Sequence, residues 1–163
     1  MDFGIPWLPP LIDIRVSHMS QIEPFLESIF INEFVNKKII YLDYPVIINK
    51  PEDPTYSGKV FQHLITRDNY RNEGRGIDME RAKRLLWCPA LISNSKDPSV
   101  LSFDYLEADG NIRTYLYLKP YKLDYLVILQ KIEKTHEVAI VSAYYIDVDY
   151  KRRSYLEKSK QAI

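Results

Sequence analysis

Hydrophobic and polar positions divide the chain into a helical first part and a strand-rich second half. Across residues 22–34, apolar side chains recur three and four residues apart, which is the repeat of one face of an α-helix. Ser17 or Ser20 can cap this helix, and Pro24 is compatible only with its first turn. The preceding residues 1–18 are rich in proline and predict an extended arm.

The next segments alternate between strand-like and loop-like composition. Residues 37–48 (KKIIYLDYPVII) are rich in β-branched and aromatic types and predict a strand, and residues 49–58 predict a loop. Residues 59–66 (KVFQHLIT) predict a short strand or an irregular run that ends near His63. The polar stretch 67–76, with two glycines, predicts a second loop.

A basic helix is predicted after that loop. Asp78 can cap it, and the apolar repeat continues through Trp87 until Pro89 ends it. Arg81 and Arg84 stand three residues apart and therefore share a face of this helix.

The second half of the chain reads as antiparallel strands. Four alternating segments predict strands over residues 99–107, 112–119, 124–133 and 137–147. Asp109-Gly110 between the first two is a strong hairpin signal. Because helices come first and strands last, the order favours the α+β class: helices packed on a four-stranded, or slightly larger, antiparallel β-sheet.

Length and composition point to one domain. The chain has 163 residues, 46% of them hydrophobic and 27% charged, as in ordinary globular proteins. We expect a single domain over residues 19–149, with its core in residues 59–147, and a charged tail over 150–163 that is a frayed helix or disordered. No apolar run approaches the ~20 residues that a membrane span needs. With Cys88 as its single cysteine, the chain is expected in the cytoplasm.

Charge is distributed unevenly although the net charge is zero. Residues 1–58 carry 4 basic and 8 acidic side chains, whereas residues 59–95 carry 7 basic and 4 acidic ones. A locally basic segment can hold phosphate in a neutral protein. On charge alone, a solvated and salt-bridged helix face is the favoured interpretation.

Several classes of active site find no signature in the sequence. There is no Gly-rich phosphate loop, no HExxH, no paired CxxC and no GxSxG, and the three histidines lie far apart. We therefore expect neither a metal ion nor another cofactor.

The remaining polar residues suit metal-free RNA cleavage. That reaction needs a base for the ribose 2′-hydroxyl, an acid for the leaving 5′-oxygen and fixed cations around the phosphorane. Candidate catalytic residues are His63, Arg81, Arg84, Ser142 and Tyr144, the last two placed on one strand face by alternation. Candidate substrate-binding residues are Thr66, Arg67, Arg113, Tyr115, Tyr117 and Lys119, the last four forming a basic and aromatic stripe on one strand.

Each candidate has a plain structural alternative. A histidine in an apolar run is often a core residue, and the two helix arginines can be surface charges. Ser142 can be a small buried strand residue, and tyrosines such as Tyr115 and Tyr117 favour strands in any case.

Taken together, these motifs resemble the barnase–EndoU–colicin–RelE nuclease superfamily, in particular its phage and polymorphic-toxin variants. The resemblance covers about residues 59–147 and rests on VFQHLITRDNYR, GIDMERAKRLLW and AIVSAYYID. Its pattern is a histidine with nearby threonine and arginine, an arginine before a tryptophan, and a final strand ending in Thr-Ala-Tyr. The counterparts are His63, Thr66, Arg67, Arg81 or Arg84, Trp87 and Ser142-Ala143-Tyr144, with serine in place of threonine.

The resemblance implies a metal-independent endoribonuclease, often a toxin that acts on tRNA or other RNA and meets a cognate immunity or antitoxin protein. Two alternatives stay open: a binding module on the same fold that holds RNA or a protein without catalysis, and a structural protein without a nucleic-acid role. The nuclease hypothesis predicts that His63, Arg81 or Arg84, Ser142 and Tyr144 converge on one cleft.

Overall fold

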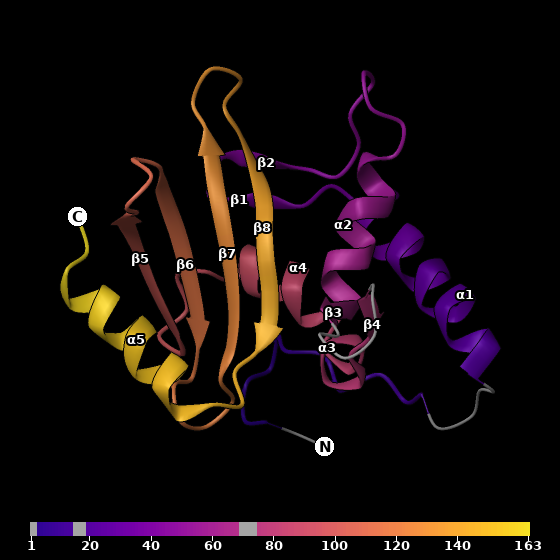
Figure 1. Cartoon of the computed structure of the whole chain (residues 1–163), viewed down its shortest axis with the longest axis horizontal. Helices are drawn as coiled ribbons and strands as arrows, with labels where there is room; N and C mark the ends of the chain where they lie inside the picture. The colour runs from indigo at the N-terminus through magenta and orange to yellow at the C-terminus, as the bar shows by residue number, and fades with distance from the viewer. Residues whose placement is uncertain (1–2, 15–18, 69–74) are drawn as a thin grey trace.

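The computed structural model describes residues 3–14, 19–68 and 75–163 of the chain, and its helices and strands are drawn in Figure 1. Its helices are α1 (Met19–Phe30), the π-helix η1 (Ile31–Val35), α2 (Tyr56–Ile65), α3 (Met79–Lys83), α4 (Trp87–Ser93) and α5 (Asp149–Lys160). Its strands are β1 (Ile40–Tyr41), β2 (Tyr44–Ile47), β3 (Thr66–Asp68), β4 (Arg75–Ile77), β5 (Val100–Leu106), β6 (Ile112–Leu118), β7 (Tyr125–Ile132) and β8 (Glu137–Tyr145).

Within these described ranges, six strands form one strongly curled sheet in the order β1-β2-β8-β7-β6-β5. The antiparallel meander β5–β8 confirms the strands predicted in the second half. β2, however, runs parallel to β8, so the expectation of an entirely antiparallel sheet is wrong. The α+β class is confirmed. No helix in the described part of the chain is long and apolar enough to cross a membrane.

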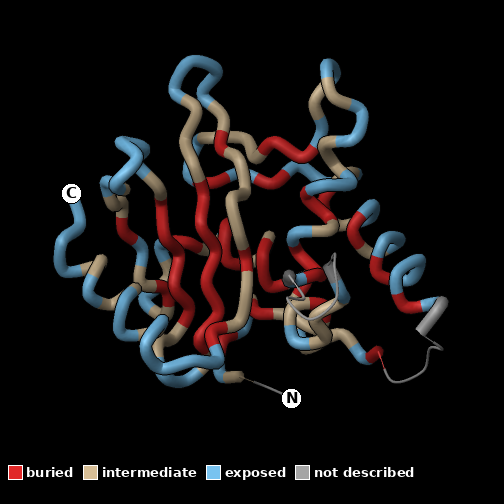
Figure 2. Tube along the Cα trace, viewed as in Figure 1, coloured by how far each residue is buried: buried red, intermediate tan, exposed pale blue. Residues whose placement is uncertain are grey.

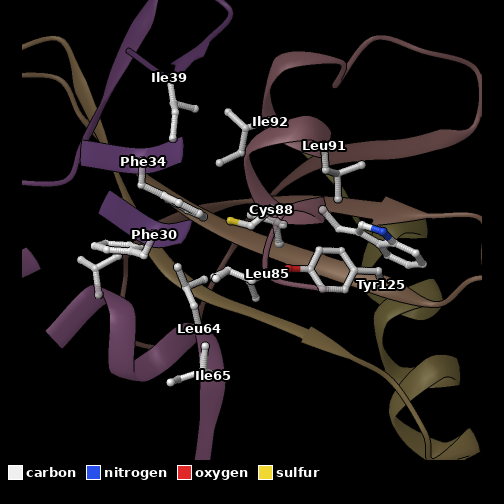
Figure 3. Close-up of a cluster of buried hydrophobic side chains, with 14 of the residues drawn as sticks. Phe30, Phe34, Ile39, Leu64, Ile65, Leu85, Cys88, Leu91, Ile92 and Tyr125 are labelled. Atoms are coloured by element: carbon white, nitrogen blue, oxygen red, sulfur yellow. The ribbon is translucent and has the colours of Figure 1, made fainter. Parts of the chain in front are cut away.

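One face of this sheet packs against the helices of the first half. Leu116, Val127 and Leu129 from the strands join side chains of α1, η1, α2 and α4 in one apolar core. Figure 3 shows a close-up of this core, with Cys88 and Leu91 of α4 beside Tyr125 of β7. In Figure 2 the buried residues run along β6 and β7 and through the helices beside them.

The arm contributes to the same core. Over residues 3–14 it forms no helix or strand, but it buries Ile5, Leu8 and Ile14. The indole nitrogen of Trp87 donates to the Pro9 carbonyl at 2.8 Å, which ties the arm to α4. The arm therefore contributes to the packed core, although it has no regular secondary structure over these residues.

Helix α5 covers the opposite face of the sheet, lying against β5 and β6 (Figure 1). Tyr155 and Leu156 of α5 pack against a second, smaller apolar cluster that includes Phe103, Tyr115 and Tyr117. The disordered alternative for the tail over 150–163 is therefore wrong, because the tail is a docked helix.

Three local predictions need correction. Residues 37–48 form two strands rather than one, since the chain reverses at Leu42, whose φ of 55° is left-handed. Residues 59–66 are mostly helix, because four apolar side chains at helical spacing bury one face of α2.

The helix capped by Asp78 stops at Lys83, and α4 begins at Trp87. The cap itself is confirmed: the Asp78 carboxylate accepts from the backbone N–H groups of Glu80 and Arg81.

Candidate functional site

The last strand, β8, leaves part of one edge open. β2 pairs with β8 only at Val138 and Ala139. In the described part of the chain, no other strand continues this pairing, and the rest of the edge lies toward α2 and α3 (Figure 1). A register shift between Ile140 and Ser142 interrupts the ladder with β7, so one extra residue is inserted before the C-terminal end of β8.

Arg81 joins the end of α2 to this edge. Its Nη1 donates to the carbonyl oxygens of Thr66 at 2.7 Å and His63 at 3.1 Å. The guanidinium carbon also lies 5.3 Å from the ring centroid of Tyr144. A cation at the carbonyl end of a helix and over an aromatic ring is favourable on both counts. Arg81 therefore holds α2 and β8 together, with 18% of its side chain exposed.

Arg84 makes the corresponding contact with the next tyrosine of β8. Its guanidinium carbon lies 4.3 Å from the ring centroid of Tyr145 and 5.1 Å from that of Trp87. Its Nη1 donates to Glu80 Oε2 at 2.6 Å, and this hydrogen bond is the main cause that lowers the pKa of Glu80. Its Nε is buried and has no hydrogen-bond partner among the described residues.

Arg67 is the exposed cation of the group. Its side chain is 61% exposed, and its Nη1 lies 3.5 Å from Asp78 Oδ2 and 4.0 Å from Asp147 Oδ2. The neighbouring Thr66 is buried instead, and its hydroxyl donates to the Gln62 carbonyl. We call Arg67, Arg81, Arg84, Tyr144 and Tyr145 the arginine–tyrosine edge.

His63 is linked to this edge through its carbonyl but also lines a separate cavity. It belongs to the last turn of α2 and is exposed. This cavity lies between α1, η1 and α2, and its lining includes neither Arg81 nor Tyr144. Ser142 is partly buried on β8, two residues before Tyr144. The structure thus brings Arg81, Arg84 and Tyr144 to one edge, whereas His63 is part of the lining of a separate cavity.

The predicted basic and aromatic stripe on β6 is not an exposed stacking surface. Tyr115 and Tyr117 are 2% and 0% exposed, because α5 covers this face of the sheet. The Tyr115 hydroxyl donates to Glu107, and the Tyr117 hydroxyl donates to Asp124 at 2.7 Å. Arg113 lies 4.0 Å from Asp109, and Lys119 is partly buried at the end of the strand.

Tyr145 was missed by sequence reasoning. Strict alternation along the last strand separates it from Tyr144 and turns it away from the site. The two residues do alternate, with Tyr144 opposite Leu126 and Tyr145 opposite Tyr125, but each ring lies beside one of the two arginines, Arg81 or Arg84. The sequence did contain a signal for this contact: two adjacent tyrosines in the last strand and two arginines three residues apart, which can form two arginine–tyrosine pairs.

The search for a metal-ion site and the comparisons with known proteins do not identify the reaction of this site. Across residues 3–14, 19–68 and 75–163, no group of three or more His, Cys, Asp or Glu side chains could hold a metal ion. Comparisons with models of protein families, with curated proteins and with solved structures find no match to this chain.

Proposed function

We propose that this protein is a metal-independent endoribonuclease of the barnase–EndoU–colicin–RelE type that binds RNA along the arginine–tyrosine edge. The observation that carries the proposal is the gathering of three arginines and two tyrosines from β3, from α3 with its C-terminal cap, and from β8. Arginine matches phosphate oxygens with parallel donors, and tyrosine rings stack on bases.

Two residues of the edge, Arg67 and Arg84, and the neighbouring His63 have distinct parts in this proposal. Arg67 is the most exposed cation and makes the first contact with the phosphate backbone. Arg84 brings a buried Nε–H that has no partner among the described residues. His63, exposed on the last turn of α2, supplies the group that takes the 2′ proton from a strand crossing the end of this helix. Toxicity to the producing cell, action on tRNA or another cytoplasmic RNA, and a cognate antitoxin are parts of the same proposal.

A second candidate is an RNA-binding module without catalysis. It is favoured by the internal use of the arginine donors, since Arg81 bonds two carbonyls and Arg84 bonds Glu80. Arginines whose donors are occupied in this way can hold the tyrosine rings in place for stacking on bases. They have fewer donors left to stabilise a phosphorane.

Incubation of purified protein with RNA in EDTA tests the first candidate. We expect cleavage that leaves a 2′,3′-cyclic phosphate and leaves DNA intact, because DNA lacks the 2′-oxygen. His63→Ala should retain the fold, since the side chain is exposed, and should lose about 10²–10⁴-fold in rate. Arg67→Ala should weaken RNA binding, and Lys134→Ala, in the turn before β8, is the matched control.

The outcomes separate the candidates. RNA binding that depends on Arg67 but occurs without cleavage supports the binding module. DNA cleavage, or activity that appears only with added Mg²⁺, contradicts the mechanism. If the protein neither binds nor cleaves RNA, both candidates are wrong. Growth arrest on expression that His63→Ala relieves would support the toxin role.

A further inference from the structure

The cavity that His63 lines has the dimensions of a ligand site. It has a volume of about 670 Å³ and lies between α1, η1 and α2. Sites for small molecules typically enclose roughly 300–1,000 Å³ and combine an apolar floor with a few polar groups. Here Phe30 and Phe61 contribute apolar surface, whereas Ser57, Lys59 and His63 contribute polar groups.

Gly58, which lines this cavity, is an unexpected residue for its place in a helix. Glycine is among the weakest helix formers, yet Gly58 is the third residue of α2. The fold does not require it, because a Cβ added here meets nothing within 4 Å and the backbone is not left-handed. Gly58 lines the cavity, so a larger side chain would extend into this open space. Glycine at this position therefore leaves space at the wall of the cavity that a larger side chain can occupy.

The π-helix η1 forms the opposite wall. Ile31 and Val35, its first and last residues, both line the cavity, and Ile31 is one of the exposed large apolar side chains. A π-helical turn is an uncommon element that occurs often at functional sites. The exposed side chain of Ile31 therefore offers apolar surface that a flat ligand in the cavity can cover.

His63 connects this cavity with the arginine–tyrosine edge. Its carbonyl accepts from Arg81, which also contacts Tyr144, and His63 is itself one of the residues that line the cavity. A single nucleic-acid strand can therefore have its phosphate at the edge and an adjacent base on the other side of the last turn of α2. The apolar floor suits the flat face of a base, and the polar groups at the rim suit its hydrogen-bonding edge.

We infer that the cavity between α1, η1 and α2 binds an unstacked nucleobase of the RNA held at the arginine–tyrosine edge. This inference rests on the proposed action on RNA and adds a base-recognition subsite to it. The subsite makes the protein selective for one base in single-stranded RNA, next to the phosphate at the edge.

Blocking the cavity at Gly58 tests the inference. Gly58→Phe fills the open space, whereas Gly58→Ala is the matched control that leaves most of the cavity free. Binding of the four ribonucleoside 3′-monophosphates, measured by calorimetry, should show a preference for one base in the unmodified protein and in Gly58→Ala. Gly58→Phe should lose at least about tenfold in affinity for that nucleotide and lose the preference. Ser57→Phe, in the same turn, is a second blocking variant in case Gly58→Phe does not fold.

The results distinguish this inference from the proposed function. Unchanged nucleotide affinity in folded Gly58→Phe or Ser57→Phe overturns the base subsite, and so does the absence of any base preference in the unmodified protein. RNA binding that still depends on Arg67 in those cases leaves the proposed function standing. If the protein neither binds nor cleaves RNA but Gly58→Phe abolishes nucleotide binding, the cavity is a nucleotide-binding site and the proposed function is wrong.

Discussion

The two faces of the curled sheet are covered in different ways. The face toward α1, α2 and α4 buries a large core of aliphatic and aromatic side chains, including Trp87 and Tyr125, whose rings meet edge to face at 5.6 Å. The face under α5 has a smaller cluster and a helix with no buried residue of its own. The helices on the first face are held by apolar packing, whereas α5 depends strongly on polar contacts.

Two polar networks attach α5 to its face. Arg152 of α5 contacts Asp124 at 2.8 Å, and the same carboxylate accepts from the Tyr117 hydroxyl. Further along the helix, Lys158 contacts both Glu107 and the Tyr115 hydroxyl. Because these networks end on charged groups, this cover responds to pH and to the loss of single hydroxyls, whereas the apolar core responds to lost volume.

The largest effect is expected from truncating the packed core. Trp87→Ala removes a buried indole that contacts Phe3 and Tyr125 and donates to Pro9, and it should lower the free energy of unfolding by about 3–5 kcal/mol. Leu156→Ala, on the α5 side, should cost about 1 kcal/mol. Urea denaturation measures both, and equal losses would contradict the distinction between the two faces.

A single hydroxyl under α5 should matter next. Tyr117→Phe removes a hydrogen bond to the Asp124 carboxylate without changing the ring, and should lower the free energy of unfolding by about 1–2 kcal/mol. Tyr150→Phe, on the exposed side of the same helix, is the matched control. If both variants unfold at the same urea concentration as the unmodified protein, the hydroxyl does not help to hold α5.

Acid should weaken the α5 side through Asp124. Burial acts to raise the pKa of this carboxyl, but hydrogen bonds from Arg152, Tyr117 and the Tyr121 N–H together lower it. A lowered pKa in the folded state contributes stability that is fully present above the pKa of the unfolded chain, near 4. This contribution is lost as pH falls through the folded value.

Stability measured between pH 6 and pH 2 checks this expectation. Asp124→Asn should be less stable at neutral pH and should lose less on acidification, because it lacks the titrating group. An unchanged acid slope in Asp124→Asn would assign the acid sensitivity to other carboxyl groups, such as Glu80 or Asp97, whose pKa values are also lowered.

The smallest effect has the opposite sign and lies on the packed side. Gly58→Ala should raise the free energy of unfolding by about 0.5–1 kcal/mol, since alanine favours the helix and its Cβ meets nothing within 4 Å. Thermal unfolding measures the gain. A loss of stability would show that α2 needs glycine for its own packing and would remove the argument that Gly58 is there for the cavity.

Local pattern was sufficient where neighbouring residues alone decide the structure. The strands β5–β8 follow from alternation, and the hairpin follows from Asp109-Gly110, where Gly110 has a φ of 88°. The Asp78 cap follows from the side chain's own reach to nearby N–H groups. Arg81 and Arg84 were likewise visible as a pair from their spacing, before any contact was known.

Tertiary packing decided what several sequence patterns left open. Val60, Phe61, Leu64 and Ile65 form a helix because that spacing buries all four together, although their composition also suits a strand. Tyr115 and Tyr117 are buried because α5 returns over β6, and alternation cannot tell an exposed face from a covered one.

The candidate site shows the same division between sequence and structure. The sequence by itself determined the arginine pair, the final strand with Tyr144 and the histidine on an apolar run. Only the fold placed both Tyr144 and Tyr145 beside arginines, because β2 leaves β8 after Ala139 and α3 contacts β8. Only the fold made His63 part of the lining of a separate cavity, because tertiary packing decides which face of α2 is buried and which is left open. Contacts between distant segments arise from burial shared among elements, which no local pattern contains.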